Sequence, residues 1–256
     1  MSFPDASNPV WAALLVLAGA AGAWLLFRCL RWHQSRLGNV RDPKHARLSF
    51  AQEGEDLLLD KIFSDQAEGF YVDVGAHHPT KFSNTCRLHQ RGWRGLNIDP
   101  RPGMKELFDA ARPHDINLCL GIDEPQATLT YIQFNEPALN TFDRALAEQR
   151  LQQRAGAWRI VAETPVAVRP LSAVLAEHLP PGTVIDLLTI DAEGWDLRVL
   201  RSNDWARFRP TVVLVESGGD SLEEDLHGAE ARLLAQHGYV LLGKTFRTLL
   251  FRLRPA

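Results

Sequence analysis

Short apolar runs alternate with longer amphipathic segments over most of the chain. Runs such as residues 70–74 and 184–190 are too brief for helices and are bounded by turn-forming residues, which favours buried strands. The amphipathic segments between them favour helices. Because strands and helices alternate, we predict a parallel sheet with helices on both faces. The expected strands are residues 70–74, 95–100, 115–122, 184–190 and 211–215, followed by an antiparallel pair at 239–242 and 248–253.

Helix signals mark the segments between these strands. Residues 49–63 are expected to form a helix with Ser49 as its N-cap, because acidic residues occupy the first turns. Residues 82–91 are expected to form the helix after the first strand. Further helices are expected over residues 102–111, 171–179 and 221–237, with a shorter one ending near residue 200.

The middle of the chain carries a different β pattern. Residues 126–134 alternate between apolar and polar, which predicts an edge strand or one arm of a hairpin, and residues 158–168 predict another β segment. Between them, residues 141–155 are polar and rich in Gln and Arg, as in a helix. This helix could form a lid or an acceptor-binding insertion, or it could be a solvated surface helix.

The N-terminal part is organised differently. Residues 10–27 contain no charged side chain, and a helix of this length with a few flanking residues spans a hydrocarbon layer. A cleaved signal peptide or a buried helix is the alternative, but a signal would have basic residues ahead of the apolar run, where the charged residue is Asp5. We therefore predict a short tail at residues 1–9, a transmembrane anchor at 10–30, a basic juxtamembrane linker at 31–48 and one folded domain at 49–256.

Basic residues follow the apolar run. They are Arg28, Arg31, Arg36, Arg41, Lys44 and Arg47, opposed by Asp42. Cytoplasmic flanks of membrane helices carry an excess of Lys and Arg, so the N-terminus is expected outside and the folded domain in the cytoplasm. The same residues could also contact anionic lipid head groups.

Composition limits the size of the core and the kind of partner. The chain has 256 residues, of which 45% are hydrophobic, so one ordinary core is easily buried. A net charge of −3 gives no general attraction for nucleic acid, and none is expected as a partner. Cys29, Cys86 and Cys119 are widely spaced without a Cys-x-x-Cys pair, which fits a reducing compartment.

Two acidic residues accompany the first two expected strands. Asp73 lies in the stretch Val-Asp-Val-Gly-Ala, which turns at Gly75, and Asp99 ends the second strand. In open parallel sheets, ligands bind beyond the carboxyl ends of the strands, and a carboxylate there can hold ribose hydroxyls. One glycine is too few for the G-x-G-x-x-G of a dinucleotide site, so a cofactor without a pyrophosphate is favoured over NAD. This arrangement is typical of S-adenosylmethionine-dependent methyltransferases.

Six blocks of sequence, in the same order, resemble the FkbM-type methyltransferase family. They are residues 49–56, 72–79, 82–85, 92–99, 137–142 and 190–194. The resemblance covers the chain from about residue 49 to 253 and leaves the membrane span outside. It implies an α/β, Rossmann-like methyltransferase domain with about seven mostly parallel strands, helices on both faces and an antiparallel last strand. It also implies methyl transfer from S-adenosylmethionine to an oxygen of a small molecule or saccharide. Its rivals are a non-catalytic cofactor-binding scaffold in a membrane assembly and, less favoured, a nucleotide-sugar oxidoreductase.

Seven residues are expected to contact the cofactor. They are Asp73, Gly75, Ala76, Ser83, Asn84, Asp99 and Asp191. Asp99 is expected to hold the ribose hydroxyls, and Asp73 either orients the methionine amine or fixes its own loop. Ser83 and Asn84, with Thr85, either cap the following helix or contact the methionine carboxylate at the positive end of that helix.

The acceptor is expected to meet two histidines and two carboxylates. His77 or His78 is the expected base, although a loop-stabilising hydrogen bond is an equal alternative. Asp191 or Glu193 is expected to orient the acceptor. The pair could also hold a magnesium ion or stabilise a turn, but two carboxylates do not make a metal site, and none is predicted. Weaker candidates for the pocket are Gln52, Glu55, Asn140, Thr141 and Glu216.

Overall fold

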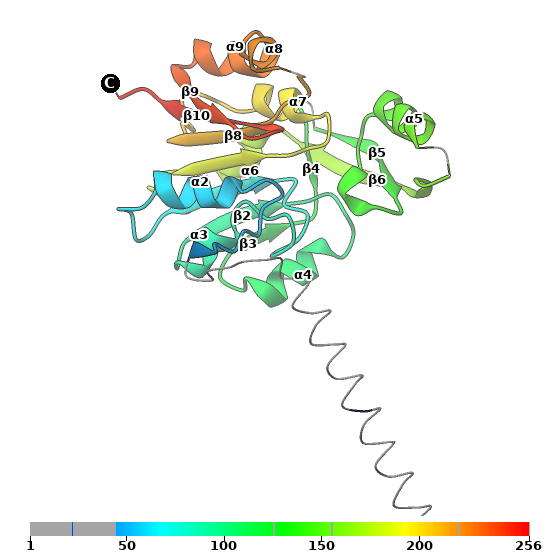
Figure 1. Cartoon of the computed structure of the whole chain (residues 1–256), viewed down its shortest axis with the longest axis horizontal. Helices are drawn as coiled ribbons and strands as arrows, with labels where there is room; N and C mark the ends of the chain where they lie inside the picture. The colour runs from blue at the N-terminus through cyan, green and yellow to red at the C-terminus, as the bar shows by residue number, and fades with distance from the viewer. Residues whose placement is uncertain (1–21, 23–44, 125, 155, 220, 256) are drawn as a thin grey trace, which may run out of the picture. The chain divides into compact units, whose positions relative to one another are not determined.

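A computed structural model describes residues 22, 45–124, 126–154, 156–219 and 221–255 of the chain (Figure 1). The chain divides into two units, Met1–Leu48 and Ser49–Ala256. Apart from residue 22, the predicted transmembrane anchor at residues 10–30 lies outside the described residues. Within the described ranges, no helix is both long and apolar enough to cross a membrane.

The second unit is built around a seven-stranded sheet with the order β3-β2-β1-β7-β8-β10-β9. The pairs from β3 to β8 are parallel, whereas β10 is antiparallel to both of its neighbours, which confirms the predicted mixed α/β sheet. The chain builds outward from β1 to β3 on one side and then continues at β7 on the other, so the carboxyl ends of β1 and β7 form the crevice where open sheets bind ligands. The strands are β1 (Phe70–Val74), β2 (Arg94–Ile98), β3 (Ile116–Leu118), β7 (Leu187–Ile190), β8 (Val212–Glu216), β9 (Tyr239–Lys244) and β10 (Thr248–Leu253).

Helices cover both faces of this sheet because successive strand residues point to opposite sides. Val72 and Val74 pack with residues of α6, α7 and α9, while Tyr71 packs on the opposite face with residues of α2 and α3. The helices are α2 (Glu55–Ile62), α3 (Cys86–Gln90), α4 (Met104–Ala111), α5 (Arg144–Gln153), α6 (Leu171–His178), α7 (Asp196–Arg201), α8 (Leu222–Leu226) and α9 (Ala229–Gln236), with a short 3-10 helix, η2 (Pro137–Leu139).

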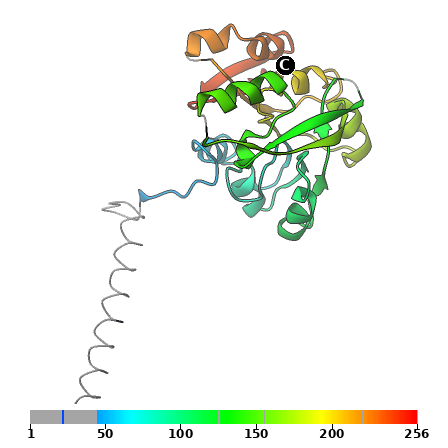
Figure 2. The same ribbon diagram turned by 90° about the vertical axis from the view of Figure 1, so that its right-hand side faces the viewer.

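A second, three-stranded sheet lies on one side of the domain together with α5 (Figures 1 and 2). Its strands are β4 (Gly121–Ile122), β5 (Ala127–Phe134) and β6 (Ile160–Arg169), in the order β4-β6-β5. β5 lies at the edge of this sheet and pairs antiparallel with β6, which confirms the edge strand that was one of the two predicted alternatives. The polar helix α5 is attached to this sheet by Ala147, which packs with Ile132 and Phe134.

Two predicted elements, the strand at 115–122 and the helix at 221–237, are each divided in the structure. The segment 115–122 is not one strand, because the chain leaves β3 and joins the other sheet, where Gly121 pairs with Val168. The helix expected over 221–237 is interrupted between α8 and α9, where Gly228 has an extended conformation. An apolar run indicates that a strand is buried but not which strand it pairs with. The division of residues 115–122 between two sheets could therefore not be predicted from the sequence.

Ser49 is not the N-cap that was predicted, because the first helix begins only at Glu55. The hydroxyl of Ser49 donates to the carboxylate of Asp56 at 2.6 Å, and the backbone N–H of Phe50 donates to the same carboxylate at 2.7 Å. Asp56 is fully buried. This carboxylate therefore holds the residues before the helix beside its first turn instead of within it.

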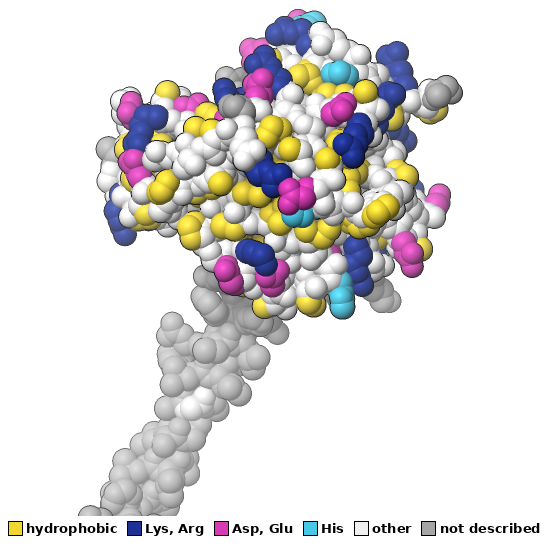
Figure 3. Space-filling model, turned by 180° about the vertical axis from the view of Figure 1, so that it is seen from behind, with side chains coloured by type: hydrophobic (Ala, Val, Ile, Leu, Met, Phe, Trp, Pro, Cys, Tyr) yellow, Lys and Arg dark blue, Asp and Glu magenta, His cyan; other side chains and the backbone are white. Residues whose placement is uncertain are grey.

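Charges of both signs are interspersed on the face of the protein shown in Figure 3. Among the described residues, ion pairs at the surface include Lys105 with Asp109 at 2.5 Å and Arg169 with Glu177 at 2.6 Å. A nucleic-acid backbone attracts extended positive surfaces. The side chains visible on this face form no extended surface of one charge.

Candidate functional site

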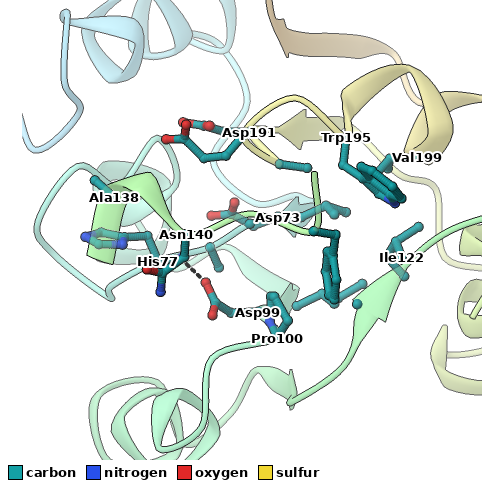
Figure 4. A pocket seen from close by; sticks show the side chains of 18 of the residues that line it. Asp73, His77, Asp99, Pro100, Ile122, Ala138, Asn140, Asp191, Trp195 and Val199 are labelled. Atoms are coloured by element: carbon teal, nitrogen blue, oxygen red, sulfur yellow. Dashed lines mark hydrogen bonds between the residues drawn. The ribbon is translucent and has the colours of Figure 1, made fainter. Parts of the chain in front are cut away.

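A cavity lies at the carboxyl ends of β1, β2 and β7. Asp73, Asp99 and Asp191 come from these three strand ends and surround the cavity in Figure 4. Trp195 and Ile122 lie on the opposite side in the same view. The parallel order of the strands thus brings the predicted acidic residues to one cavity, as expected for the crevice of an open sheet.

Aromatic side chains form one wall of this cavity. The ring centroids of Tyr131 and Phe142 are 4.9 Å apart, and those of Phe142 and Trp195 are 6.0 Å apart. Tyr131 belongs to β5, Phe142 follows η2 and Trp195 precedes α7, so the second sheet supplies part of the wall. The sequence does not single out these residues, because no local pattern distinguishes the wall of a pocket from a core.

Gly75 lies where two loops meet. It has a φ of +81°, and a Cβ at this position would lie 1.8 Å from the carbonyl oxygen of Asp191. The N–H groups of Gly75 and Ala76 donate to the carbonyl of Ile98 at 2.9 and 3.1 Å, and the N–H of Asp191 donates to that of Val74 at 3.0 Å. Glycine is therefore required at position 75 because the two backbones approach each other closely there. Contact of Gly75 or Ala76 with a cofactor stays a prediction.

Asp99 keeps part of its hydrogen-bonding capacity free. One carboxylate oxygen accepts the backbone N–H of His77 and the other accepts that of Arg101, both at 2.8 Å. Burial raises the pKa of Asp99, while these two N–H donors act in the opposite direction. Each carboxylate oxygen can accept another hydrogen bond, so a pair of ribose hydroxyls fits this residue.

Asp73 is buried, and one of its oxygens accepts the hydroxyl of Thr85 at 2.7 Å. Burial raises the pKa of Asp73 to about 6, whereas the Thr85 hydroxyl and the positive charge of Arg112 lower it. The other carboxylate oxygen of Asp73 can still accept a donor from a ligand in the cavity.

Neither Ser83 nor Thr85 caps the helix α3 by a side-chain hydrogen bond, contrary to that part of the prediction. The hydroxyl of Ser83 accepts from the guanidinium of Arg112 at 3.0 Å, and the amide of Asn84 donates to the hydroxyl of Thr189 at 3.0 Å. Asn84 lines the cavity, whereas the buried Ser83 does not. The three polar residues point inward and therefore connect β1, β7 and α4. They do not cap α3, which has only five residues.

The two histidines have different positions. His77 lines the cavity, and burial together with Arg101 lowers its pKa to about 4. His78 is not among the residues that line the cavity, and its Nδ1 accepts the backbone N–H groups of Thr80 and Lys81 at 3.0 and 3.1 Å. The predicted role of His78 as a base facing the pocket is therefore not supported by its position, and the alternative of a loop-stabilising hydrogen bond describes it.

Three carboxylates gather beside the cavity. Asp191, Glu193 and Glu216 each offer an oxygen, and these oxygens lie within 4.8 Å of one another. Burial and the charge of Glu216 raise the pKa of Asp191 well above its ordinary value. Burial and the charge of Asp191 raise the pKa of Glu193 to about 8, although its ion pair with Arg150 lowers it. Burial and the charge of Glu193 raise the pKa of Glu216 to about 8. Such a cluster can share protons or hold a divalent cation through hard oxygen ligands.

The cluster lies between two cavities. Asp191 and Glu193 line the first, whereas Glu216 and Arg150 line the second. The buried Oδ1 of Asp191 has no hydrogen-bond partner within the described part of the protein. Asp191 and Glu193 lie close together in the sequence, whereas Glu216 joins them through the pairing of β7 with β8, which local sequence does not show.

Three residues in the cavity wall have unusual backbone conformations. His77, Phe82 and Glu193 have φ values of +53°, +56° and +50°, which residues other than glycine rarely adopt. Strained residues of this kind concentrate at ligand sites, where the surrounding structure holds them in place. The conformations therefore support a functional role for both loops.

The weaker candidates are divided. Gln52 and Asn140 line the cavity, although the Asn140 Oδ1 accepts the backbone N–H of Phe134 at 2.8 Å. The hydroxyl of Thr141 donates to the carbonyl of Glu193 at 2.8 Å and so holds the acidic loop. Glu55 accepts the hydroxyl of Thr245 at 2.7 Å and does not line the cavity.

A comparison with known protein families matches the part of the chain that contains Asp73, Asp99 and Asp191. The pattern of the family described as "Methyltransferase FkbM domain" matches residues 73–241. No curated protein matches the chain. The crystal structure of a TehB-like SAM-dependent methyltransferase from Corynebacterium glutamicum ATCC 13032 Kitasato is similar at 12% identity over 91% of this chain and 100% of that chain, with a TM-score of 0.38.

Proposed function

Because this chain belongs to the FkbM methyltransferase family, we propose that it transfers a methyl group from S-adenosylmethionine to a hydroxyl of a small molecule or saccharide. The observation that carries the proposal is the cavity at the carboxyl ends of β1, β2 and β7, where Asp73 and Asp99 keep free acceptor capacity. A cofactor with a ribose and an ammonium group has donors for both carboxylates.

The residues present fit this cofactor. Asp99 would hold the ribose hydroxyls, and the free oxygen of Asp73 would accept from the amine. The apolar and aromatic surface of Ile122, Phe142 and Trp195 would cover an adenine ring. Binding sites of this kind are mostly apolar and contain a few placed polar groups.

When bound, the cofactor supplies an electrophilic methyl group, which bonds to the acceptor oxygen while the C–S electron pair stays on sulfur. The protein's task is then to hold the acceptor in line, since good orientation alone can be worth about 7 to 11 kcal/mol. We assign this task to Asp191 and Glu193, because both line the cavity and Glu193 also adjoins the second cavity through Arg150. The second cavity is therefore our proposed acceptor site.

The base that takes the acceptor proton is assigned to the same cluster. An efficient base has a pKa near the working pH and contributes about 10²- to 10⁴-fold. With a pKa of about 8, Glu193 meets this condition better than His77, whose pKa is about 4. We therefore move the role of base from the histidines to Glu193. His77 keeps a role in the loop, where its backbone N–H donates to the carboxylate of Asp99.

The membrane anchor at residues 10–30 and the cytoplasmic position of the domain belong to the same proposal. Their support is the uncharged run followed by basic residues. A C-terminal alkaline phosphatase fusion, which is active only after export, should be inactive, while a C-terminal fluorescent fusion should sediment with membranes. An active phosphatase fusion would reverse the proposed topology.

The proposed activity is tested with cofactor and acceptor separately. Calorimetry should show binding of S-adenosylhomocysteine and no comparable binding of NAD. Methyl-labelled S-adenosylmethionine should then transfer label to a member of a panel of soluble and lipid-linked saccharides. Arg91→Gln is the matched control, because Arg91 donates to the carbonyls of Phe63 and Gln66 and does not line the cavity.

The outcomes separate the candidate functions. Absence of S-adenosylhomocysteine binding in the folded protein would refute the proposal. A second outcome is that S-adenosylhomocysteine binds but no label is transferred, either to an acceptor of the panel or to water-soluble and lipid-linked fractions of the host cell. This outcome would favour a non-catalytic scaffold instead.

A further inference from the structure

A buried arginine lies behind the cofactor cavity at the end of α4. Arg112 is 1% exposed and does not line the cavity. Its guanidinium donates to five oxygens, those of Pro79 (2.6 Å), Thr85 (2.9 Å), Ser83 (3.0 Å), Asn97 (3.2 Å) and Tyr71 (3.2 Å). A charge this deeply buried needs such a set of partners.

The hydrogen bonds of Arg112 determine the direction of a relay toward Asp73. A guanidinium only donates, so the Thr85 hydroxyl must accept from Arg112. The one hydroxyl proton of Thr85 is then free for its 2.7 Å bond to the Asp73 carboxylate. One oxygen of Asp73 is thereby occupied from behind the strand, which leaves the other for the cavity.

Arg112 also holds the loop between Gly75 and α3. It donates to the carbonyl of Pro79 and to the hydroxyl of Ser83, at both ends of the segment that carries Phe82 into the cavity wall. Removing the guanidinium would leave these buried acceptors without their donor, which costs more than a missing hydrogen bond in solvent.

We propose that Arg112 is a positioning residue for the cofactor: through Thr85 it orients the Asp73 carboxylate, and through Pro79 and Ser83 it holds the loop after Gly75. The inference rests on the proposed function, because the ligand of Asp73 is taken to be the amine of S-adenosylmethionine.

The charge of Arg112 adds a signature that a purely structural role lacks. The charged and titratable groups that act on Asp73 or lie next to it are Arg112, Asp99, Asp115, Asp191 and Tyr71. Arg112 lowers the pKa of Asp73, and the carboxylates raise it. Without the guanidinium, Asp73 takes up its proton at higher pH, and a protonated Asp73 is a poor acceptor for an ammonium group. Binding should then need a higher pH.

The test measures S-adenosylhomocysteine binding by calorimetry from pH 5.5 to 9, with urea unfolding of the same samples. The full-length variants are Arg112→Gln, Arg112→Lys, Thr85→Val and Thr85→Ser, with Arg91→Gln as the control. At pH 7, Thr85→Val should raise the dissociation constant about tenfold, as for a lost hydrogen bond to a charged group. Thr85→Ser should bind like the unmodified protein.

Arg112→Gln should move the midpoint of the pH profile upward, and Arg112→Lys should restore much of it because the positive charge remains. If Arg112→Gln does not fold, the isosteric Thr85→Val decides the question. The proposal is overturned if Thr85→Val and any folded Arg112 variant keep the unmodified dissociation constant and pH midpoint. Failure of the unmodified protein to bind S-adenosylhomocysteine would instead overturn the cofactor assignment, and this inference with it.

Discussion

Replacing Gly75 by alanine tests the close approach of the two loops that build the cavity. At this position φ is +81°, and the new Cβ would lie 1.8 Å from the carbonyl oxygen of Asp191 and 2.8 Å from its carbonyl carbon. Real Cβ atoms essentially never come closer than 3.0 Å to another heavy atom, so one backbone must move by more than about 1 Å. The hydrogen bonds from Gly75 to Ile98 and from Asp191 to Val74 hold these backbones in place.

The expected loss of stability has two parts. A left-handed conformation costs an alanine about 1 to 2 kcal/mol. Forcing extra volume into a packed site costs about 1 to 3 kcal/mol more. We therefore expect Gly75→Ala to lower the free energy of unfolding by about 2 to 5 kcal/mol.

Gly103 provides a matched control. It has a φ of +84°, but a Cβ there would meet nothing within 4 Å. Gly103→Ala should therefore show only the conformational part, about 1 to 2 kcal/mol. Urea unfolding of the two full-length variants, followed by circular dichroism, measures the difference. Calorimetry with S-adenosylhomocysteine should also show weaker binding for folded Gly75→Ala, because one of the displaced loops follows Asp73, and unchanged binding for Gly103→Ala.

The reasoning is refuted if Gly75→Ala is no less stable than Gly103→Ala. Such a result would mean that the loops separate without cost, and that the contact between Gly75 and Asp191 does not define the cavity.

The remaining predictions concern ligand affinity, pH and turnover. Asp99→Ala should weaken S-adenosylhomocysteine binding by about 1.5 to 3 kcal/mol, the range for hydrogen bonds to a charged group, and an unchanged dissociation constant by calorimetry would remove Asp99 from the site. The pKa of Glu216 is raised from 4.5 to about 8, so the folded protein binds more protons than the unfolded chain in this window and stability should fall as the pH rises through it. Glu216→Gln should flatten this decline in urea unfolding series; an equally steep decline would contradict it. With an identified acceptor, Asp191→Asn should lower turnover at least about tenfold with little change in cofactor affinity, and His77→Ala should lower it less. The opposite order in labelled-methyl assays would restore His77 as the base.

Local periodicity determined much of the fold. The brief apolar runs at β1, β2, β7 and β8 predicted buried parallel strands, and the structure confirms them with small shifts of their bounds. It follows that Asp73, Asp99 and Asp191, which end or adjoin such runs, share one edge of the sheet. This part could be read from the chain because side-chain alternation and strand ends are properties of a few consecutive residues.

Other parts of the site depended on tertiary structure. Arg112 at the end of α4 donates to the hydroxyl of Tyr71 in β1, and Glu216 joins Asp191 because β8 pairs with β7. Likewise Phe142 contacts both Tyr131 of the second sheet and Trp195. These contacts join segments far apart in the sequence, and the pattern within any one segment is the same whichever neighbour it meets. The sequence alone therefore determined which residues would be buried or lie at strand ends, whereas the packing of elements decided which polar and aromatic groups meet there and how burial alters their charge.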